Sequence, residues 1–275
     1  MKNIEATHSE DHKYNWSILN ATTLKWIACV LMFLDHIHQM FGYRGAPIWL
    51  TMAGRLVFPI FLFVSAESFH YTHSKKKYLQ RLLFASWGMT IFTFVLPKIL
   101  PNSNIVLMNN AFSTFFIAGL YMLFWNYFTE GIRTKSWKKI LKAVLCSFIP
   151  IIGALPVYLV AVLSFNQEIP SSVIRLLVGI ALLIPNILIV EGGFAMVALG
   201  VAFYISRKYR WLQIAILFVL SGIIYVVDGG FQWLMCFASI PMLLYNGKRG
   251  IGMKNFFYIF YPAHIGILYL LSTIL

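Results

Sequence analysis

Residues 24–41 have the sequence LKWIACVLMFLDHIHQMF, an apolar stretch that carries an acid next to a histidine. The stretch is long enough to cross a bilayer as a helix, and a helix satisfies its backbone hydrogen bonds internally. Ionisable side chains inside such a segment are costly and rare, so Asp35 and His36 mark a candidate functional site. Lys25 lies 11 residues before His36, which on a helix is about three turns, or ~16 Å, on nearly the same face.

The composition of the 275-residue chain predicts an integral membrane protein. The chain is 60% hydrophobic and 11% charged, with a mean hydropathy of +0.76, and it cannot cover its apolar surface as a soluble domain does. Its net charge of +13 would favour nucleic acid in a soluble protein. Here the cations lie between the hydrophobic spans, as the positive-inside rule predicts, so we expect no nucleic-acid partner. The three cysteines have no metal-ligand spacing, and no metal site is expected.

The long apolar stretches between short basic loops predict an all-α, polytopic transmembrane helical bundle rather than a β-barrel. We expect about nine to ten membrane helices in a single domain, residues 24–275, after a polar N-terminal tail, residues 1–23. The expected spans are residues 24–41, 48–72, 82–100, 106–128, 143–165, 186–206, 211–228, 231–246 and 255–274.

Four basic clusters set the expected topology. Residues 73–81, 133–142, 207–210 and 247–254 should all be cytoplasmic, and the N-terminus with them. The number of crossings between the second and third clusters must then be even, although three apolar pieces lie there. We interpret SSVIRLLVGIALLIP (171–185) as a re-entrant or interfacial helix, because it is short and lies between two prolines. The alternative is ten full crossings with one violation of the charge rule.

In this topology, polar side chains from several spans share a depth in the outer part of the membrane: Asp35, His36, Arg55, Asn109, Asn110 and Glu191. Glu67 lies further in on the second span, and His264 near the middle of the last. Adjacent helical residues point ~100° apart, so Asp35 is expected to engage Arg55 or another helix rather than His36. Structural alternatives remain open: Arg55 as a bridge between helices, the asparagines as interhelical hydrogen bonds, and His264 as a packed histidine.

These residues favour acyl transfer. A neutral imidazole can take a proton from an attacking amine or hydroxyl, and a carboxylate can stabilise the imidazolium. Arg55 could stabilise a thioester oxyanion or hold an acceptor carboxylate. The GxSxG, P-loop and HExxH motifs are absent. An alternative is a proton-coupled transporter or flippase that uses the Asp, His, Arg and Glu side chains as a relay, although no inverted repeat of interrupted helices is found. A third is a structural protein that only positions an exported peptide.

The chain resembles the TraX family, which is named for the enzyme that acetylates the N-terminus of conjugative pilin. The resemblance rests on LKWIACVLMFLDHI, GRLVFPIFLFVSAESF, KKKYLQRLLF, NNAFSTFFIAGL, EGGFAMVALGVAFYISRK and LLYNGKRGIGMKNFFYIFYPAHIGILYL, in order from about residue 24 to 274, with 142–185 unmatched. The family is similar in turn to membrane acyltransferases that carry Arg or Lys, ten residues, then His on their first helix. Lys25 and His36 fit that pattern.

The resemblance implies a multi-pass acetyltransferase of the cell membrane, surrounded by lipid, with acetyl-CoA as the donor from the cytoplasm. The acceptor would be an exported peptide, a pilin-like protein or an envelope molecule. His36 would be the base, Asp35 its electrostatic partner, and Arg55 and Glu67 polar members of the pocket, with Asn109, Asn110, Glu191 and His264 beside them. The phosphates would lie among Lys25, Lys75, Lys76, Lys77 and Arg81. The chain has Glu191-Gly192-Gly193 where the family usually has Asp-Tyr-Gly, and Ser68 where Gly is common.

Overall fold

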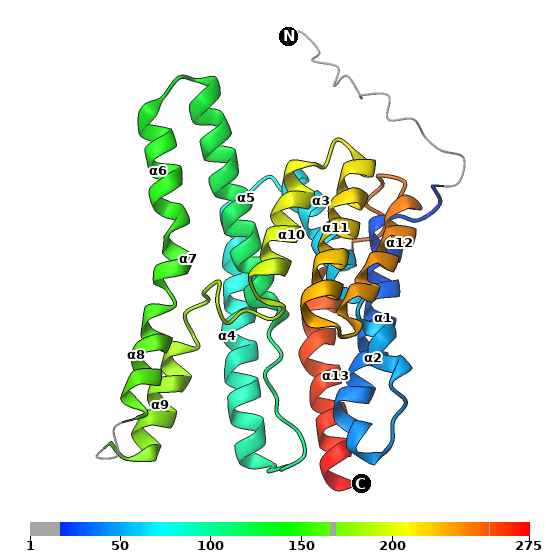
Figure 1. The fold of residues 1–275 in the computed structure, drawn as a ribbon, viewed down its shortest axis with the longest axis vertical. Coiled ribbons are helices and arrows are strands. Elements are labelled where there is room, and N and C mark those ends of the chain that lie inside the picture. The colour runs from blue at the N-terminus through cyan, green and yellow to red at the C-terminus, as the bar shows by residue number, and fades with distance from the viewer. Residues whose placement is uncertain (1–16, 166–168, 253) are drawn as a thin grey trace.

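The computed structural model describes residues 17–165, 169–252 and 254–275, and this part of the chain is an all-α bundle (Figure 1). Its α-helices are α1 (Ala21–Phe41), α2 (Trp49–Gly54), α3 (Val57–Tyr71), α4 (Lys75–Ile99), α5 (Ala111–Arg133), α6 (Trp137–Ser147), α7 (Ile149–Ile152), α8 (Leu155–Leu163), α9 (Ser171–Ala181), α10 (Gly193–Ile205), α11 (Arg210–Asp228), α12 (Ser239–Leu243) and α13 (Lys254–Ile274). Two 3-10 helices, η1 (Gly42–Arg44) and η2 (Phe231–Ala238), complete the described elements.

The helices identify a multi-pass membrane protein. Within the described ranges, six helical stretches are long and apolar enough to cross a membrane: Trp49–Tyr71, Lys75–Ile99, Ala111–Arg133, Trp137–Leu163, Arg210–Asp228 and Asn255–Ile274. Three further apolar helical stretches are shorter, Ser171–Ala181, Gly193–Ile205 and Phe231–Leu243. Helix α1 has 21 residues, also enough for a crossing, and carries the polar residues singled out above.

The basic loops gather at one end of the bundle. In Figure 1 the loops that follow α3, α5, α10 and α12 all lie at the upper end, where the described chain enters α1. The last of these loops is tied to α1, since the backbone N–H of Ala21 donates to the carbonyl of Lys248 at 2.9 Å. The Asn20 side chain accepts from the Thr23 N–H and caps α1, so the helix begins three residues before the expected span. The cytoplasmic placement of this end stays a prediction.

Helices α1 and α13 run parallel and pack along their length. Aromatic rings join their first halves, where the centroids of Trp26 and Phe256 are 4.6 Å apart. Near their far ends, the Tyr43 hydroxyl donates to the carbonyl of Ser272 at 2.9 Å. Both helices contribute to an apolar cluster that includes Met32, Met40, Ile265 and Leu268. This packing surrounds the pair of residues that forms the centre of the candidate site.

The second expected span, 48–72, is broken into α2 and α3 at Arg55 and Leu56. Pro59 explains the break, because proline lacks the N–H that would bond to the carbonyl of Arg55 and its ring crowds that carbonyl. The backbone of α2 also approaches α1 closely, at Gly54. A Cβ atom there would overlap the side chain of Asp35, so glycine permits the contact between the two helices.

The fourth expected span, 106–128, begins later than predicted, at Ala111. Helix α4 ends at Ile99 before Pro101, and the chain then returns in extended form, with Ile105, Leu107 and Asn109 buried and the residues between them exposed. This alternation is typical of an extended segment with one buried face. The side chain of Asn110 then accepts from the Ser113 N–H and caps α5. The extended segment thus delivers two asparagines to the interior of the bundle.

Residues 137–165 run to the far end of the bundle, and residues 169–205 return from it. Helices α6, α7 and α8 lead away from the basic end, and α9 returns only part of the way before 182–192 crosses to α10 (Figure 1). The short helix α9 is therefore half of one return path that α10 completes, rather than a re-entrant loop between full crossings. The even number of crossings expected between the second and third basic clusters is kept in this arrangement.

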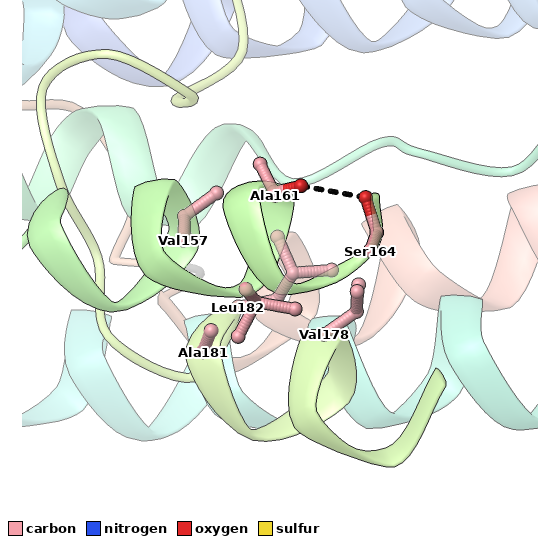
Figure 2. A pocket seen from close by; sticks show the side chains of 7 residues that line it. Val157, Ala161, Ser164, Val178, Ala181 and Leu182 are labelled. Carbon is pink, nitrogen blue, oxygen red and sulfur yellow. Dashed lines mark hydrogen bonds between the residues drawn. The ribbon is translucent and has the colours of Figure 1, made fainter. Parts of the chain in front are cut away.

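Helices α8 and α9 enclose a small pocket with about 360 Å³ of empty space (Figure 2). Its lining is apolar except for Ser164, whose hydroxyl donates to the carbonyl of Ala161 on its own helix at 2.6 Å. A serine that bonds back to its helix is not poised as a nucleophile. This pocket offers no group for chemistry.

Candidate functional site

His36 and His264 form the centre of the site. His36 is 4% exposed on α1, His264 is 4% exposed on α13, and His36 Nδ1 lies 2.6 Å from His264 Nε2. His264 Nδ1 lies 2.6 Å from the carbonyl oxygen of Phe260, one turn earlier on α13. The carbonyl can only accept, so the proton of a neutral His264 is on Nδ1 and its Nε2 is an acceptor. His36 Nδ1–H then donates to it, which leaves His36 Nε2 with a free lone pair.

That lone pair faces the amide of Asn109. The Asn109 Nδ2 atom lies 3.4 Å from His36 Nε2, near the limit of a hydrogen bond, and so the contact is weak. The same amide is held firmly by Gln39 in a reciprocal pair, with N···O distances of 2.9 and 3.1 Å. The amide pair ties the extended segment to α1, and Gln39 itself is exposed. A substrate N–H or O–H could therefore replace the weak contact without breaking the strong ones.

Aromatic rings hold the histidines in place. The rings of His36 and His264 are nearly parallel, with an angle of 17° between their planes and centroids 4.8 Å apart, and they meet end to end at the hydrogen bond. Phe260 stacks on His264 with centroids 4.6 Å apart, and Tyr261 lies beside both histidines at about 6 Å. A buried imidazole held by rings and by a hydrogen bond on Nδ1 has little rotational freedom, so the direction of its Nε2 atom is set by the fold.

Asp35 belongs to a separate network that bridges α1 to α2 and η2. Its Oδ1 atom accepts from the hydroxyl of Thr51 at 2.6 Å and from Arg55 Nη2 at 3.0 Å. Arg55 also donates from Nη1 to the side chain of Gln232 at 3.1 Å and from Nε to the Thr51 carbonyl. Within the described ranges, Asp35 has no hydrogen bond or ion pair with His36. The prediction that Asp35 engages Arg55 or another helix is thus confirmed.

Glu191 forms a third network just before α10. Its Oε2 atom accepts from the backbone N–H of Asn110 at 2.8 Å and from the Tyr261 hydroxyl at 3.0 Å. The Tyr261 hydroxyl in turn accepts from the N–H of Ala111. The Asn110 amide donates to the Thr90 hydroxyl at 2.9 Å. These bonds fix the start of α5, and with it Asn109, against α13.

The structure therefore brings most of the predicted polar layer together, but in three networks. His36, His264 and Asn109 form one, Asp35 and Arg55 another, and Glu191 and Asn110 the third. Glu67 lies apart on α3, 12 residues beyond Arg55 and toward the basic end.

The five basic residues that are predicted to bind the phosphates of acetyl-CoA all lie at or near the basic end of the bundle. The ammonium of Lys25 lies 5.3 Å above the ring of Phe257. Lys75 donates to the carbonyl of Phe69 at 3.1 Å and so caps α3, whereas Lys76, Lys77 and Arg81 are exposed. The side chains of Cys29 and Met32, between Lys25 and His36, are buried against α13. Among the described residues, no group of three or more His, Cys, Asp or Glu side chains could hold a metal ion.

Among the contributors that were not predicted from the sequence are Gln39, Thr51, Gln232 and Tyr261. Helical spacing pointed to three of them. Gln39 follows His36 by three residues, Thr51 precedes Arg55 by four, and Tyr261 precedes His264 by three, and such pairs share a helix face. For Gln232, on a 3-10 helix far along the chain, the sequence holds no comparable signal.

Comparison with models of known protein families shows which family the chain belongs to. The family model described as TraX protein matches residues 20–153 and 147–272. The chain belongs to the TraX family. The match includes residues 142–185, which the sequence resemblance had left out. Searches of curated proteins and of solved structures each found no match.

Proposed function

We propose that this TraX-family chain is a membrane acetyltransferase that uses His36 as its general base. The observation that supports this most is the hydrogen bond from His36 Nδ1–H to His264 Nε2, because it leaves the lone pair on Nε2. A general base must present its lone pair to the proton that it removes, in a position set before substrate arrives. His36 meets both conditions, and the third residue, Phe260, sets the proton positions in the pair through its carbonyl.

In the proposed reaction an acceptor amine or hydroxyl attacks the carbonyl carbon of the acetyl thioester. His36 Nε2 takes the proton from the attacking atom, and the bond between carbon and sulfur breaks in the tetrahedral intermediate. The imidazolium then returns the proton to the departing thiolate, so that coenzyme A leaves as the thiol. The Asn109 amide is suited to donate to the thioester oxygen, since its Nδ2 atom already lies beside His36 Nε2.

The basic end of the bundle suits the donor. Acetyl-CoA carries phosphates at one end and the thioester at the other, and its pantetheine arm can span the ~16 Å between Lys25 and His36 on one face of α1. Lys25, Lys76, Lys77 and Arg81 would bind the phosphates. Lys75 contributes charge but its ammonium already caps α3. Because Cys29 and Met32 are buried against α13, we propose that the arm separates α1 from α13 locally as it binds.

The acceptor we propose is the N-terminal amine of an exported peptide or pilin-like protein, with an envelope hydroxyl as the alternative. Family membership favours the amine. The exposed side chain of Gln39, three residues beyond His36 toward the end opposite the basic loops, lies on the route by which such an acceptor would reach Nε2.

Turnover of labelled acetyl-CoA by the purified protein in nanodiscs tests the proposal. We expect wild-type protein to transfer or hydrolyse the label, and His36→Ala to lower turnover by roughly 100-fold to 10,000-fold, the usual contribution of a general base. His38→Ala is the matched control, because His38 lies on the same helix but bonds to the carbonyl of Ala46 at 2.9 Å. Full turnover in His36→Ala, or no turnover in wild-type protein, would contradict the proposal.

Donor binding is tested separately by titrating coenzyme A. We expect Lys25→Glu to raise the dissociation constant for coenzyme A several-fold, because it reverses the charge of a residue proposed to bind the phosphates. Lys138→Glu is the matched control. It makes the same change of net charge at the same end of the bundle, but on α6 rather than on α1. Equal effects of the two variants would show that only the overall charge matters.

A further inference from the structure

A second pocket lies beside the ion pair of Arg55 with Asp35. It is open, has about 590 Å³ of empty space, and is lined by Thr51, Arg55, Asp228, Phe231 and Gln232. These residues come from α2, from the turn after it, from the last residue of α11 and from η2. Helix α11 starts at the basic end, so the pocket is displaced toward the opposite end of the bundle.

Asp228 is the unusual member of this pocket. Five acidic residues lie within the described ranges, and four of them have interactions: Asp35 with Arg55, Glu130 with Lys139, Glu191 with Tyr261, and Glu67, which is not free either. Of these five, Asp228 alone has no hydrogen bond or ion pair with a described residue. Asp228 is exposed at the end of its helix, so its carboxylate is accessible to a ligand in the pocket.

Its position on α11 is also unfavourable for structure alone. Asp228 is the last residue of the helix, and Gly229, with φ +64°, ends it. The C-terminal end of a helix carries partial negative charge from its unbonded carbonyls, so a carboxylate there is repelled by the helix dipole. Both the carboxylate and the helix end favour a positive group in the pocket.

The charges around the pocket add up to a negative site. Arg55 is neutralised by Asp35, at 3.0 Å, which leaves Asp228 as the uncompensated charge among the residues that line the pocket. Gln232 accepts from Arg55 through its oxygen, and the one contact of its Nε2 within the described part of the chain is with the sulfur of Met235, at 3.7 Å. This amide can therefore donate to a ligand carbonyl.

We propose that this pocket is the docking site for the protonated N-terminus of the acceptor peptide, with the ammonium on Asp228 and the first carbonyl on Gln232. This inference rests on the proposed function for its naming of the ligand as the acceptor. An ammonium next to a carbonyl is the chemistry that distinguishes a free N-terminus from an acetylated one. The pocket would thus hold the free N-terminus until its ammonium loses a proton to water and the neutral amine moves to His36 Nε2. It would not hold the acetylated product, whose amide carries no charge.

The test is direct binding of two tripeptide amides to the full chain in nanodiscs that lack ethanolamine lipids. One peptide has a free N-terminus and the other is N-acetylated. We expect only the free peptide to bind, with affinity that falls as salt rises. Asp228→Asn should weaken binding by about fivefold or more. Glu130→Gln, which removes one carboxylate at the basic end of α5, should leave it unchanged.

The outcomes separate this inference from the proposed function. His36→Ala should still bind the free peptide with wild-type affinity, whatever its turnover. Equal binding of the two peptides, or equal binding by wild type and Asp228→Asn, would overturn the docking site even if His36 proves to be the base. Loss of peptide binding when ethanolamine lipid is added would assign the pocket to a lipid headgroup and would also overturn it.

Discussion

The Nδ1 atom of His36 lies 2.6 Å from the Nε2 atom of His264, although the two residues are 228 positions apart in the chain. The contact follows from the parallel packing of α1 and α13. The pairs Trp26 with Phe256 and Tyr43 with Ser272 are 230 and 229 positions apart, so the two helices keep nearly one register over their length. The tautomer of His36 is therefore a consequence of how the first and last described helices are aligned.

The first prediction concerns His264 as a positioning residue. His264→Ala should lower kcat by about 10-fold to 100-fold while the dissociation constant for coenzyme A stays at its wild-type value. The reason is that His36 loses the acceptor for its Nδ1–H, and its proton is then free to occupy Nε2 and block the base. Nitrogen NMR of labelled histidine should show one tautomer of His36 in wild type and a mixture in the variant. A single unchanged tautomer would contradict this role.

The second prediction separates Asp35 from the chemistry. Asp35→Ala should destabilise the protein by about 1–2 kcal/mol, because Arg55 loses its ion pair in a partly buried position. The double variant Asp35→Asn with Arg55→Gln should recover part of that stability, since neither side chain is then left charged and unpaired. The measurement is the midpoint of detergent-induced unfolding. If Asp35→Asn instead abolishes turnover at wild-type stability, Asp35 is the electrostatic partner of His36 after all.

Most of the fold could be predicted from the sequence, because long apolar stretches and basic loops determine a helical membrane protein. The wrongly predicted helix boundaries lie where a local sequence signal opposes the average hydropathy of the segment. Pro59 breaks the span at Arg55, and an alternating pattern at Ile105, Leu107 and Asn109 keeps the chain extended where hydrophobicity alone predicted a helix. Both signals are present in the sequence but are weaker than the average hydropathy of a long window.

The ionisable residues of the candidate site could be predicted from the sequence, but the contacts between them could not. The cost of burying ionisable groups identified His36, Asp35 and His264 as members. Which of them touch depends on the alignment of helices far apart in sequence, and no local pattern encodes the contact between His36 and His264. The angle between adjacent helical positions did separate Asp35 from His36 in advance, because it follows from the geometry of one helix.

The third prediction tests the close approach of α2 to α1. Gly54→Ala should destabilise the protein by about 1–3 kcal/mol, because the added methyl group overlaps the side chain of Asp35 and would push the two helices apart. Gly88→Ala is the matched control. A Cβ atom at Gly88 on α4 meets nothing within 4 Å, so this change should be neutral or stabilise by up to about 1 kcal/mol. Equal stability of the two variants would mean that α2 can move away from α1 at no cost.

The fourth prediction asks whether Glu191 acts through its hydrogen bonds or through its charge. Its Oε2 atom accepts from the Asn110 N–H and the Tyr261 hydroxyl, and the amide oxygen of glutamine can accept both. Glu191→Gln should therefore stay close to wild type in stability and turnover. Glu191→Ala should destabilise by about 1–3 kcal/mol, because it leaves two donors without an acceptor.

The same variants also report on the base. Asn109 precedes Asn110, so release of Asn110 from Glu191 should loosen the Asn109 amide beside His36 Nε2 and lower turnover in Glu191→Ala. Tyr261→Phe removes one of the two bonds and should fall between the two Glu191 variants in the midpoint of unfolding. If Glu191→Gln loses as much turnover as Glu191→Ala at wild-type stability, the carboxylate itself takes part in the reaction, and the third network joins the catalytic one.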